Sequence, residues 1–265
     1  MKKCKVFGTY EWADLTLNII DGCFHDCKYC YSKEMAIRFK RKTTDNWKVE
    51  KLRLDIDSKI KRYNGKIMFP STHDITPENA LNCIKFIKKI LEKGNSILIV
   101  SKPHFDIIKT LCNEVNEYKE KILFRFTIGS NNSDILKFWE PNAPKYEERF
   151  KTLKYAYDNG FKTSVSSEPM LDNIENTIKM TNELLPYIND SIWFGKPNFF
   201  LRRLKINGFK DELTLKRAEI LLDNLNDENI MLFYNHFKTN PYIKWKDSIK
   251  NIVGIELPNV VGLDI

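Results

Sequence analysis

Short apolar runs alternate with longer amphipathic segments along most of this 265-residue chain. The apolar runs predict strands at residues 15–20, 66–69, 96–101, 122–128, 162–167 and 191–194. Helical spacing of apolar residues predicts helices between them, at residues 77–92, 105–119, 146–159 and 174–185. Strand followed by helix, repeated in this way, indicates parallel βα units. The pattern therefore predicts an α/β fold, a partial (β/α)6 TIM-like barrel in a single domain, with its active site at the carboxyl ends of the strands.

Local signals support these boundaries. Thr76 and Pro77 are expected as the N-cap and first residue of a helix, and Gly94 and Gly160 as left-handed C-caps. After the sixth predicted strand, a helix at 214–226 leads to an apolar run at 230–234. We expect residues 1–13 to form an N-terminal extension, 14–240 the partial barrel, and 241–265 a C-terminal extension that packs on it.

Three of the six cysteines fall within eight residues, as Cys23, Cys27 and Cys30, in a C-x3-C-x2-C arrangement after the first predicted strand. Each iron of a cubane [4Fe–4S] cluster takes one thiolate, so three cysteines leave one iron without a protein ligand. That iron can bind the amino and carboxylate groups of S-adenosylmethionine (SAM). An electron from the cluster then breaks the sulfonium C–S bond, giving methionine and a 5′-deoxyadenosyl radical. The motif predicts this cofactor pair.

The other metal hypothesis is a structural zinc knot in a non-enzymatic binding protein, with His25 as the fourth ligand. His25 lies between two of the cysteines, where we expect its side chain to point away from the metal. Cys83 and Cys112 fall in predicted helices and are expected to be small buried core residues. Cys4, upstream of the first strand, is a weaker candidate for folding over the site.

The cysteine loop, with an aromatic residue before its last cysteine, resembles that of the radical SAM superfamily. A narrower similarity, to spore photoproduct lyase and the photolyase-like group, extends from residue 22 to about 170. It includes GCFHDCKYCY (22–31), RFTI (125–128), WEPNAP (139–144) and ERF (148–150). The resemblance implies that the three cysteines bind the cluster and that Tyr29 lies near the adenine of SAM. It also implies that the polar residues ending the second, third and fourth strands contact SAM, here Ser71, Thr72, His73, Lys102 and Thr127.

Several of these residues also stand out without the resemblance. Lys102 follows an apolar strand, so its ammonium is expected at the top of the barrel, where it can pair with the SAM carboxylate; a solvated lysine is the alternative. Residues 71–74 either present polar groups to the cofactor or form a turn before a helix.

Arg149 either reaches the cofactor or clamps Glu140 in a structural salt bridge. Glu168 follows the fifth strand and is a candidate acid, base or ribose acceptor. Lys102 and Glu168 are the catalytic candidates.

The chain departs from the lyase pattern at the second strand. Phe-Pro-Ser-Thr at residues 69–72 stands where the superfamily has Gly-Gly-Glu, a departure that the lyases share. Ser71 occupies the position of the lyases' hydrogen-donating cysteine. A hydroxyl O–H bond is too strong to replace a thiol as a donor to a carbon radical. Repair of spore photoproduct by that route is therefore not expected.

The formal net charge is +8, which suits an anionic partner or reflects a Lys-, Asn- and Ile-rich coding bias. Residues 199–203 combine aromatic and basic side chains. This combination suits a site that stacks on nucleobases and binds phosphate. The alternative is a loop whose phenylalanines face the core. Residues 38–42 are a second basic cluster, expected on a solvated helix face.

The substrate hypothesis is a nucleic acid base or nucleotide, and the alternative is a peptide or small metabolite. The partners expected are SAM and an electron donor such as flavodoxin or ferredoxin. No apolar run suits a membrane span and no secretory signal is recognised, so we expect a cytoplasmic protein without a membrane partner.

Overall fold

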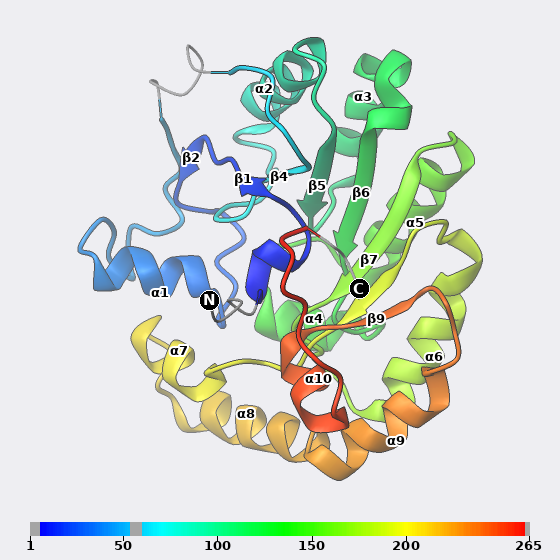
Figure 1. Ribbon diagram of the computed structural model, residues 1–265. Helices are drawn as coiled ribbons and strands as arrows, with labels where there is room; N and C mark the ends of the chain where they lie inside the picture. The colour runs from blue at the N-terminus through cyan, green and yellow to red at the C-terminus, as the bar shows by residue number, and fades with distance from the viewer. Residues whose placement is uncertain (1–5, 54–59, 263–265) are drawn as a thin grey trace.

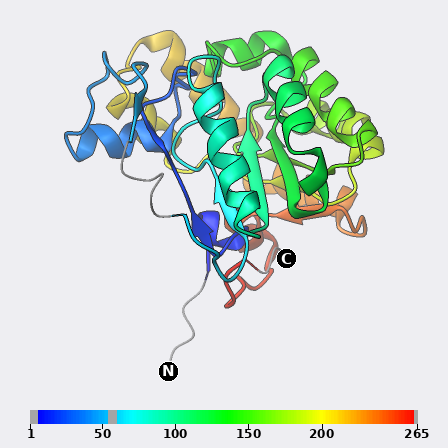
Figure 2. The same ribbon diagram turned by 90° about the horizontal axis from the view of Figure 1, so that it is seen from above.

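A seven-stranded parallel sheet runs through the computed structural model, which describes residues 6–53 and 60–262 (Figure 1). The strands lie side by side in chain order, each hydrogen-bonded to the next. They are Leu15–Thr16 (β1), Ile67–Phe69 (β4), Ile97–Ser101 (β5), Ile122–Thr127 (β6), Lys162–Ser167 (β7), Ile192–Phe194 (β8) and Ile243–Trp245 (β9). The sheet curls into a half-barrel, which confirms the predicted α/β partial barrel, with seven strands in place of six (Figures 1 and 2).

Helices cover the convex face of this sheet (Figures 1 and 2). The α-helices that follow β4 are Ala80–Glu92 (α2), Phe105–Glu114 (α3), Ser133–Trp139 (α4), Tyr146–Asp158 (α5), Ile174–Leu184 (α6), Phe200–Ile206 (α7), Glu212–Asn224 (α8), Asp227–Phe237 (α9) and Asp247–Val253 (α10). Short 3-10 turns, Asn116–Lys121 (η3) and Leu185–Tyr187 (η4), lead into β6 and β8. None of the helices in the described part of the chain has the length and apolarity that a membrane span requires.

Alternate residues along the strands face two separate apolar layers. Met68, Leu98, Leu123 and Trp193 pack with Trp12 inside the half-barrel. The neighbouring positions face the helices and form the larger core, among them Ile67, Phe69, Ile97, Ile99, Phe124, Ile192 and Phe194. Because both faces of the sheet are buried, these strands read as continuous apolar runs in the sequence. Full burial of each such side chain contributes about 1.5–3 kcal/mol to folding, so the strand ends are held on a rigid frame.

Two local predictions were wrong. The strand predicted at 15–20 divides into β1 and Ile20–Asp21 (β2), which pairs antiparallel with Lys51–Leu52 (β3) in a separate small sheet. The helix predicted from Pro77 begins at Ala80 with Asn79 as its N-cap, because residues 77–79 form a turn whose Asn79 N–H donates to the carbonyl of Thr76. By contrast, Gly94 (φ +82°) and Gly160 (φ +78°) end helices in the left-handed conformation, as predicted.

The seventh strand comes from residues predicted to be a C-terminal extension. β9 pairs with β8 in parallel register, with Ile243 opposite Ile192 and Trp245 opposite Phe194. The predicted boundary at residue 240 therefore precedes a strand of the barrel sheet itself. A three-residue strand with Lys244 at its centre has too little apolar sequence to be recognised alone.

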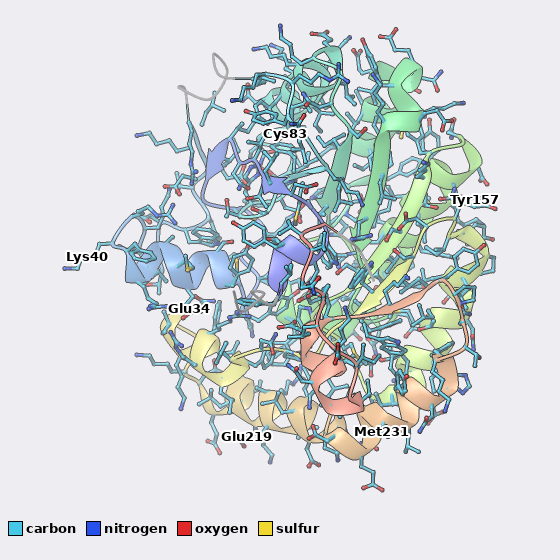
Figure 3. All side chains as sticks on the ribbon, viewed as in Figure 1. Glu34, Lys40, Cys83, Tyr157, Glu219 and Met231 are labelled. Carbon is cyan, nitrogen blue, oxygen red and sulfur yellow. The ribbon has the colours of Figure 1, made fainter. Side chains whose placement is uncertain are left out.

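The N-terminal segment lies on the concave side of the sheet, beside the C-terminal segment (Figure 1). Two hydrogen bonds join these segments. The Val6 N–H donates to the Pro258 carbonyl, 2.8 Å, and the Gly262 N–H donates to the carbonyl of Tyr10 in the 3-10 turn Gly8–Glu11 (η1), 2.7 Å. Of the isolated cysteines, Cys83 (Figure 3) and Cys112 are buried core residues as predicted. Cys4 lies outside the described residues.

Candidate active site

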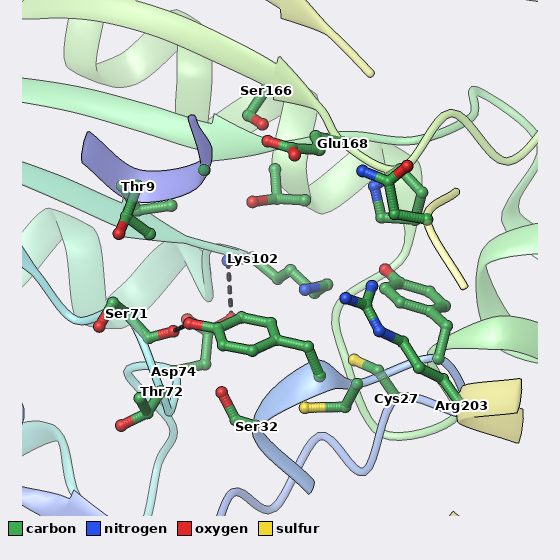
Figure 4. Close-up of a pocket in the computed structure, with 18 of the residues that line it drawn as sticks. Thr9, Cys27, Ser32, Ser71, Thr72, Asp74, Lys102, Ser166, Glu168 and Arg203 are labelled. Carbon is green, nitrogen blue, oxygen red and sulfur yellow. Dashed lines mark hydrogen bonds between the residues drawn. The ribbon is translucent and has the colours of Figure 1, made fainter. Parts of the chain in front are cut away.

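A cavity of about 520 Å³ opens at the carboxyl ends of the strands (Figure 4). Its wall brings together segments distant in sequence: η1, the cysteine loop, the ends of β4 to β9 and the start of α7. Of the predicted site residues, it includes Cys23, Cys27, Tyr29, Cys30, Ser71, Thr72, His73, Lys102, Thr127 and Glu168. Arg149 is not among the residues that line it.

The cysteine loop leaves β2 and ends at Tyr31–Arg38 (α1). Gly22 opens the loop with φ +98°, and a Cβ there would meet the carbonyl oxygen of Val49 at 2.6 Å, so only glycine fits. The Cys23 N–H donates to the carbonyl of Trp47, 3.1 Å. Cys30 is the N-cap of α1, where its Sγ accepts from the Lys33 N–H. The backbone of the loop is therefore fixed at both ends.

Burial raises the pKa of all three thiols. Asp74 and the other two cysteines raise that of Cys23 further, while Lys102 lowers that of Cys27. Cys23 and Cys27 are each only 7% exposed. Cys30 is partly buried. Three thiolates gathered in such a shielded place need a compensating positive charge, which a metal centre provides. The donor set therefore fits an iron–sulfur cluster, whose irons each take one thiolate.

His25 has partners other than a metal. Its Nδ1 lies 3.2 Å from Asp74 Oδ2 and its Nε2 lies 2.9 Å from His104 Nε2. Both ring nitrogens thus face protein atoms, which removes the fourth ligand that the zinc hypothesis needed. Within residues 6–53 and 60–262, no three His, Cys, Asp or Glu side chains are arranged to bind a single metal ion.

Asp74 joins the cysteine loop to the strand ends. Its Oδ2 accepts from the Lys102 N–H at 3.0 Å (Figure 4) and from His25. Its Oδ1 accepts from Ser101 Oγ and the Ile75 N–H. Burial alone would raise the pKa of Asp74, but His25, Lys102 and these hydrogen bonds lower it below its usual value. Asp74 is therefore a buried carboxylate that positions both the loop and Lys102.

Lys102 extends into the cavity from the end of β5 (Figure 4). Its Nζ lies 3.8 Å from Glu140 Oε1 and over the ring of Tyr29, and the side chain is 16% exposed. It is thus not a freely solvated lysine. Burial alone would lower the pKa of Lys102, but Cys27, Glu140 and Asp74 raise it above its ordinary value. The site holds a largely shielded cation near Cys27.

Arg149 acts from behind the cavity wall. Its guanidinium donates to Glu140 Oε2 at 2.5 Å, to the carbonyl of Thr127 at 3.0 Å and to the carbonyl of Pro144 at 2.8 Å. The Tyr29 hydroxyl donates to the same Glu140 carboxylate. The structural salt bridge, one of the two predicted alternatives, is the arrangement found, and it positions Glu140, Tyr29 and the end of β6.

The three polar residues after β4 have different surroundings. Ser71 Oγ accepts from the Asn18 side chain, 2.9 Å. Thr72 Oγ1 is buried and has no hydrogen-bond partner among the described residues. His73 uses both nitrogens on the backbone: Nε2 accepts from the Ile19 N–H and Nδ1 donates to the Asp74 carbonyl. Thr72 is therefore available to a ligand, and His73 holds the loop.

On the opposite wall, Glu168 extends from the end of β7 (Figure 4). Its Oε2 lies 3.8 Å from Lys246 Nζ. Burial raises the pKa of Glu168, although the Lys246 ammonium lowers it. Thr127 lines the same cavity from the end of β6.

The sequence did not identify two segments of the wall, η1 and the end of β9. Phe7, Thr9 and Trp12 line the cavity from the first. Lys246, from the second, lies 2.8 Å from Glu11 Oε1 and donates to the carbonyl of Gly8 at 2.6 Å. Lys246 directly follows β9, so its position after a strand would have identified it if that strand had been predicted.

An exposed aromatic residue stands at the rim of the cavity. Phe199, at the N-cap of α7, has φ +52° and is 68% exposed. A bulky residue in the left-handed region is uncommon and strained, a feature that gathers at functional sites. Lys196 and Arg203 line the cavity beside it.

The comparisons with known proteins agree with this site. The family model described as Radical SAM superfamily matches residues 17–182. Protein MJ0683 of Methanocaldococcus jannaschii is 26% identical over 181 residues, covering 67% of this chain and 68% of its own. Protein ORF301 of Acidianus two-tailed virus is 28% identical over 189 residues, covering 66% of this chain and 61% of its own. Neither name states a function.

Solved structures share the fold. Spore photoproduct lyase, complexed with dinucleoside spore photoproduct, has a TM-score of 0.57 at 14% identity, covering 87% of this chain and 75% of the lyase. SuiB of Streptococcus suis, bound to S-adenosylmethionine, has a TM-score of 0.57 at 13% identity, covering 92% of this chain and 53% of SuiB. The family match covers more than half of the chain, from before the cysteine loop to the helix after β7. The chain belongs to the radical SAM superfamily.

Proposed function

We propose that Cys23, Cys27 and Cys30 hold a [4Fe–4S] cluster and that the cavity beside them takes SAM. The observation that carries the proposal is the position of these three thiols on one wall of a large cavity, beside Lys102. Cys23 and Cys27 are buried and Cys30 is partly buried, and the Lys102 side chain is only 16% exposed. When bound, the cluster and SAM supply reductive cleavage of the sulfonium bond to a 5′-deoxyadenosyl radical, which abstracts hydrogen from an unreactive C–H bond.

The side chains around the cavity supply binding and orientation. The Lys102 ammonium, held by Glu140, is placed to pair with the SAM carboxylate in a charge-assisted hydrogen bond. The unpartnered Thr72 hydroxyl, with Ser71 and Thr127, adds polar contacts. Tyr29 is fixed by Glu140 for a contact with adenine. Glu168 offers a carboxylate to a ribose or substrate hydroxyl. Arg149 contributes indirectly, through Glu140.

For the substrate, we favour a nucleic acid base or nucleotide. Phe199 offers an exposed ring for stacking, and Lys196 and Arg203 offer cations for phosphate at the same rim. The net charge of +8 agrees with an anionic substrate. Ser71 cannot donate hydrogen as a thiol does, so we expect a reaction other than thiol-dependent photoproduct repair. The source of the hydrogen atom that quenches the substrate radical decides whether the enzyme is a lyase or catalyses another reaction.

A peptide substrate is the rival, since SuiB, which shares the fold at a similar TM-score, has a structure bound to its precursor peptide SuiA. Binding of single-stranded DNA and RNA to the reconstituted protein, measured over a range of salt concentrations, separates the two. Nucleic acid binding should weaken steeply as salt rises. No binding at low salt would remove the nucleotide hypothesis.

We place the enzyme in the cytoplasm, whose reducing conditions keep the described cysteines free. The cluster is expected to be oxygen-sensitive and to take its electron from a donor of the flavodoxin or ferredoxin type.

The test is SAM cleavage under anaerobic conditions. Reconstituted protein with dithionite and SAM should release 5′-deoxyadenosine, and Cys27→Ala should abolish it. Cys83→Ala, which removes a buried thiol in α2, is the matched control and should retain the activity. Equal activity in the Cys27→Ala protein would contradict the proposal.

A further inference from the structure

The chain between residues 38 and 53 lies against the outside of the cysteine loop and is strongly basic. It carries seven Lys or Arg against two Asp or Glu. One of the two acids, Glu50, is directed inward, where it accepts from the Phe24 N–H and from Thr76 Oγ1, 2.9 Å each. The outward charged side chains are thus almost all cationic. We call residues 35–53 the basic face.

Exposed apolar side chains stand among these charges. Met35, Phe39 and Val49 are 41%, 64% and 64% exposed. Lys40 extends from the molecule beyond the end of α1 (Figure 3). Apolar residues surrounded by charges are typical of surfaces that bind another protein, where an apolar centre is ringed by a polar rim. The basic face therefore has the composition of a docking site for an acidic protein.

Only a thin layer separates this face from the thiols. Cys23 packs against Ala36 and Trp47 in one buried cluster, with Cys30 beside it. The segment that carries Val49 contacts the loop directly, through the Trp47 carbonyl that accepts from the Cys23 N–H and the close approach of Val49 to Gly22. A partner seated on the basic face would be nearer to the cysteine site than one on the helices of the convex face.

We propose that the basic face docks an acidic one-electron carrier protein, which reduces the metal centre held by the cysteines across the layer of Ala36 and Trp47. This inference depends on the proposed function. One electron leaves the carrier, which is oxidised, and enters the metal centre, which is reduced; no bond forms or breaks. Charge complementarity selects the carrier and speeds its association.

The test uses a charge-reversed protein and a matched control. Lys40→Glu, Lys48→Glu and Lys51→Glu together change three exposed residues of the basic face. Lys109→Glu, Lys137→Glu and Lys216→Glu change three exposed residues on α3, α4 and α8 and alter the net charge equally. The probe is an acidic flavodoxin, titrated against each reconstituted protein by calorimetry at low and at physiological salt. The face variant should bind at least tenfold more weakly than the wild type at low salt, and the control within about twofold.

A second readout separates docking from metal binding. In stopped flow, reduced flavodoxin should be oxidised by the face variant at least tenfold more slowly than by the wild type. Dithionite, which needs no docking site, should reduce both proteins at the same rate. Iron content and far-UV circular dichroism should match across all three proteins.

Three outcomes would overturn the inference. The face variant could bind flavodoxin as tightly as the wild type does, or the control variant could lose as much flavodoxin affinity as the face variant. In the third, the face variant would lose binding of single-stranded DNA while its flavodoxin binding stayed intact. Failure of the proposed function would give a different result from failure of this inference. The wild-type protein would then lack iron, or would not cleave SAM even with dithionite.

Discussion

At the scale of single residues, the cavity depends on buried polar groups that have several partners each. Asp74 is the main example, because its carboxylate accepts hydrogen bonds from His25 in the cysteine loop and from the Lys102 N–H at the end of β5. An orientation set by such a group is rigid, since moving either element leaves a buried donor without an acceptor. The three cysteines and Lys102 lie on the two segments that Asp74 ties together.

Asp74→Asn should weaken both the fold and the metal site. An amide cannot accept all four hydrogen bonds, so we expect a loss of about 2–4 kcal/mol in the free energy of unfolding. Outer contacts of metal ligands typically affect metal affinity 10–100-fold, so iron should be lost to a chelator roughly tenfold faster. Asp172→Asn is the control, since Asp172 is equally buried and bonds Ser130 and Asn176. Asp172→Asn should lower stability but not iron retention, and equal retention in both variants would contradict the role of Asp74.

His73 gives a prediction about pH. Burial lowers the pKa of His73 to about 4, from 6.5. Between these values the unfolded chain binds a proton that the folded protein does not, so stability is fully present above pH 6.5 and falls as the pH falls toward 4. The whole interval corresponds to about 3 kcal/mol, of which about 2 kcal/mol is lost by pH 5.

Urea unfolding at pH 7 and pH 5 checks this expectation. His73→Gln has no proton to bind, so the difference between its two unfolding free energies should be about 2 kcal/mol smaller than that of the wild type. The same pH dependence in both proteins would show that His73 is not held neutral.

Some positions in the site could be predicted from the sequence, but the contacts of each side chain could not. Lys102 was found because it follows an apolar strand, and strand ends meet at one edge of a parallel sheet. The same logic placed His73 beside the cofactor, but its nitrogens bond the backbone of Ile19 and Asp74. Which side chains are used within the fold depends on such contacts between distant segments, and these are not encoded in local pattern.

At the scale of elements, the strands β4 to β8 were predicted and β9 was not. β4, β5, β6 and β8 follow the predicted ranges closely, because burial on both faces makes their sequences mostly apolar. β7, at Lys162–Ser167, also follows its predicted range, although its buried positions are mostly Thr and Ser. β9 has three residues and depends on pairing with β8. The division of the first predicted strand into β1 and β2 likewise follows from pairing with β3, thirty residues later.

The cysteine loop should be sensitive to its first residue. Gly22→Ala combines a left-handed backbone with contact against the Val49 carbonyl, whereas Gly94→Ala, also left-handed at φ +82°, meets open space. The left-handed conformation alone costs about 1–2 kcal/mol. We expect the Gly22 variant to lose at least about 2 kcal/mol more than the Gly94 variant, and to lose iron, when both are unfolded in urea. Similar losses in the two would show that the approach of residues 47–49 to the loop is not tight.

At the scale of the whole molecule, the concave side of the half-barrel is covered by the two ends of the described chain. η1 carries Glu11, which is buried between Lys246 after β9 and Lys250 in α10, at 2.8 and 3.3 Å. The same Lys246 approaches Glu168 in the cavity. Closure of the fold and the shape of the site therefore share one ion network.

Glu11→Gln should test this network. Removing the carboxylate leaves two buried ammonium groups short of a counter-charge, which typically costs about 3–5 kcal/mol. The midpoint of urea unfolding should fall accordingly. Glu175→Gln, which removes an exposed partner of Lys179, should leave the unfolding curve unchanged. A wild-type curve for Glu11→Gln would mean that η1 does not hold the molecule closed.

The central claim is that three cysteine thiolates hold an iron–sulfur cluster, and metal analysis of anaerobically purified protein tests it most directly. We predict about four irons and four sulfides per chain in the wild type and in Cys83→Ala, and neither in a protein with Cys23, Cys27 and Cys30 all changed to alanine. Stoichiometric zinc without iron in the wild type would contradict the account.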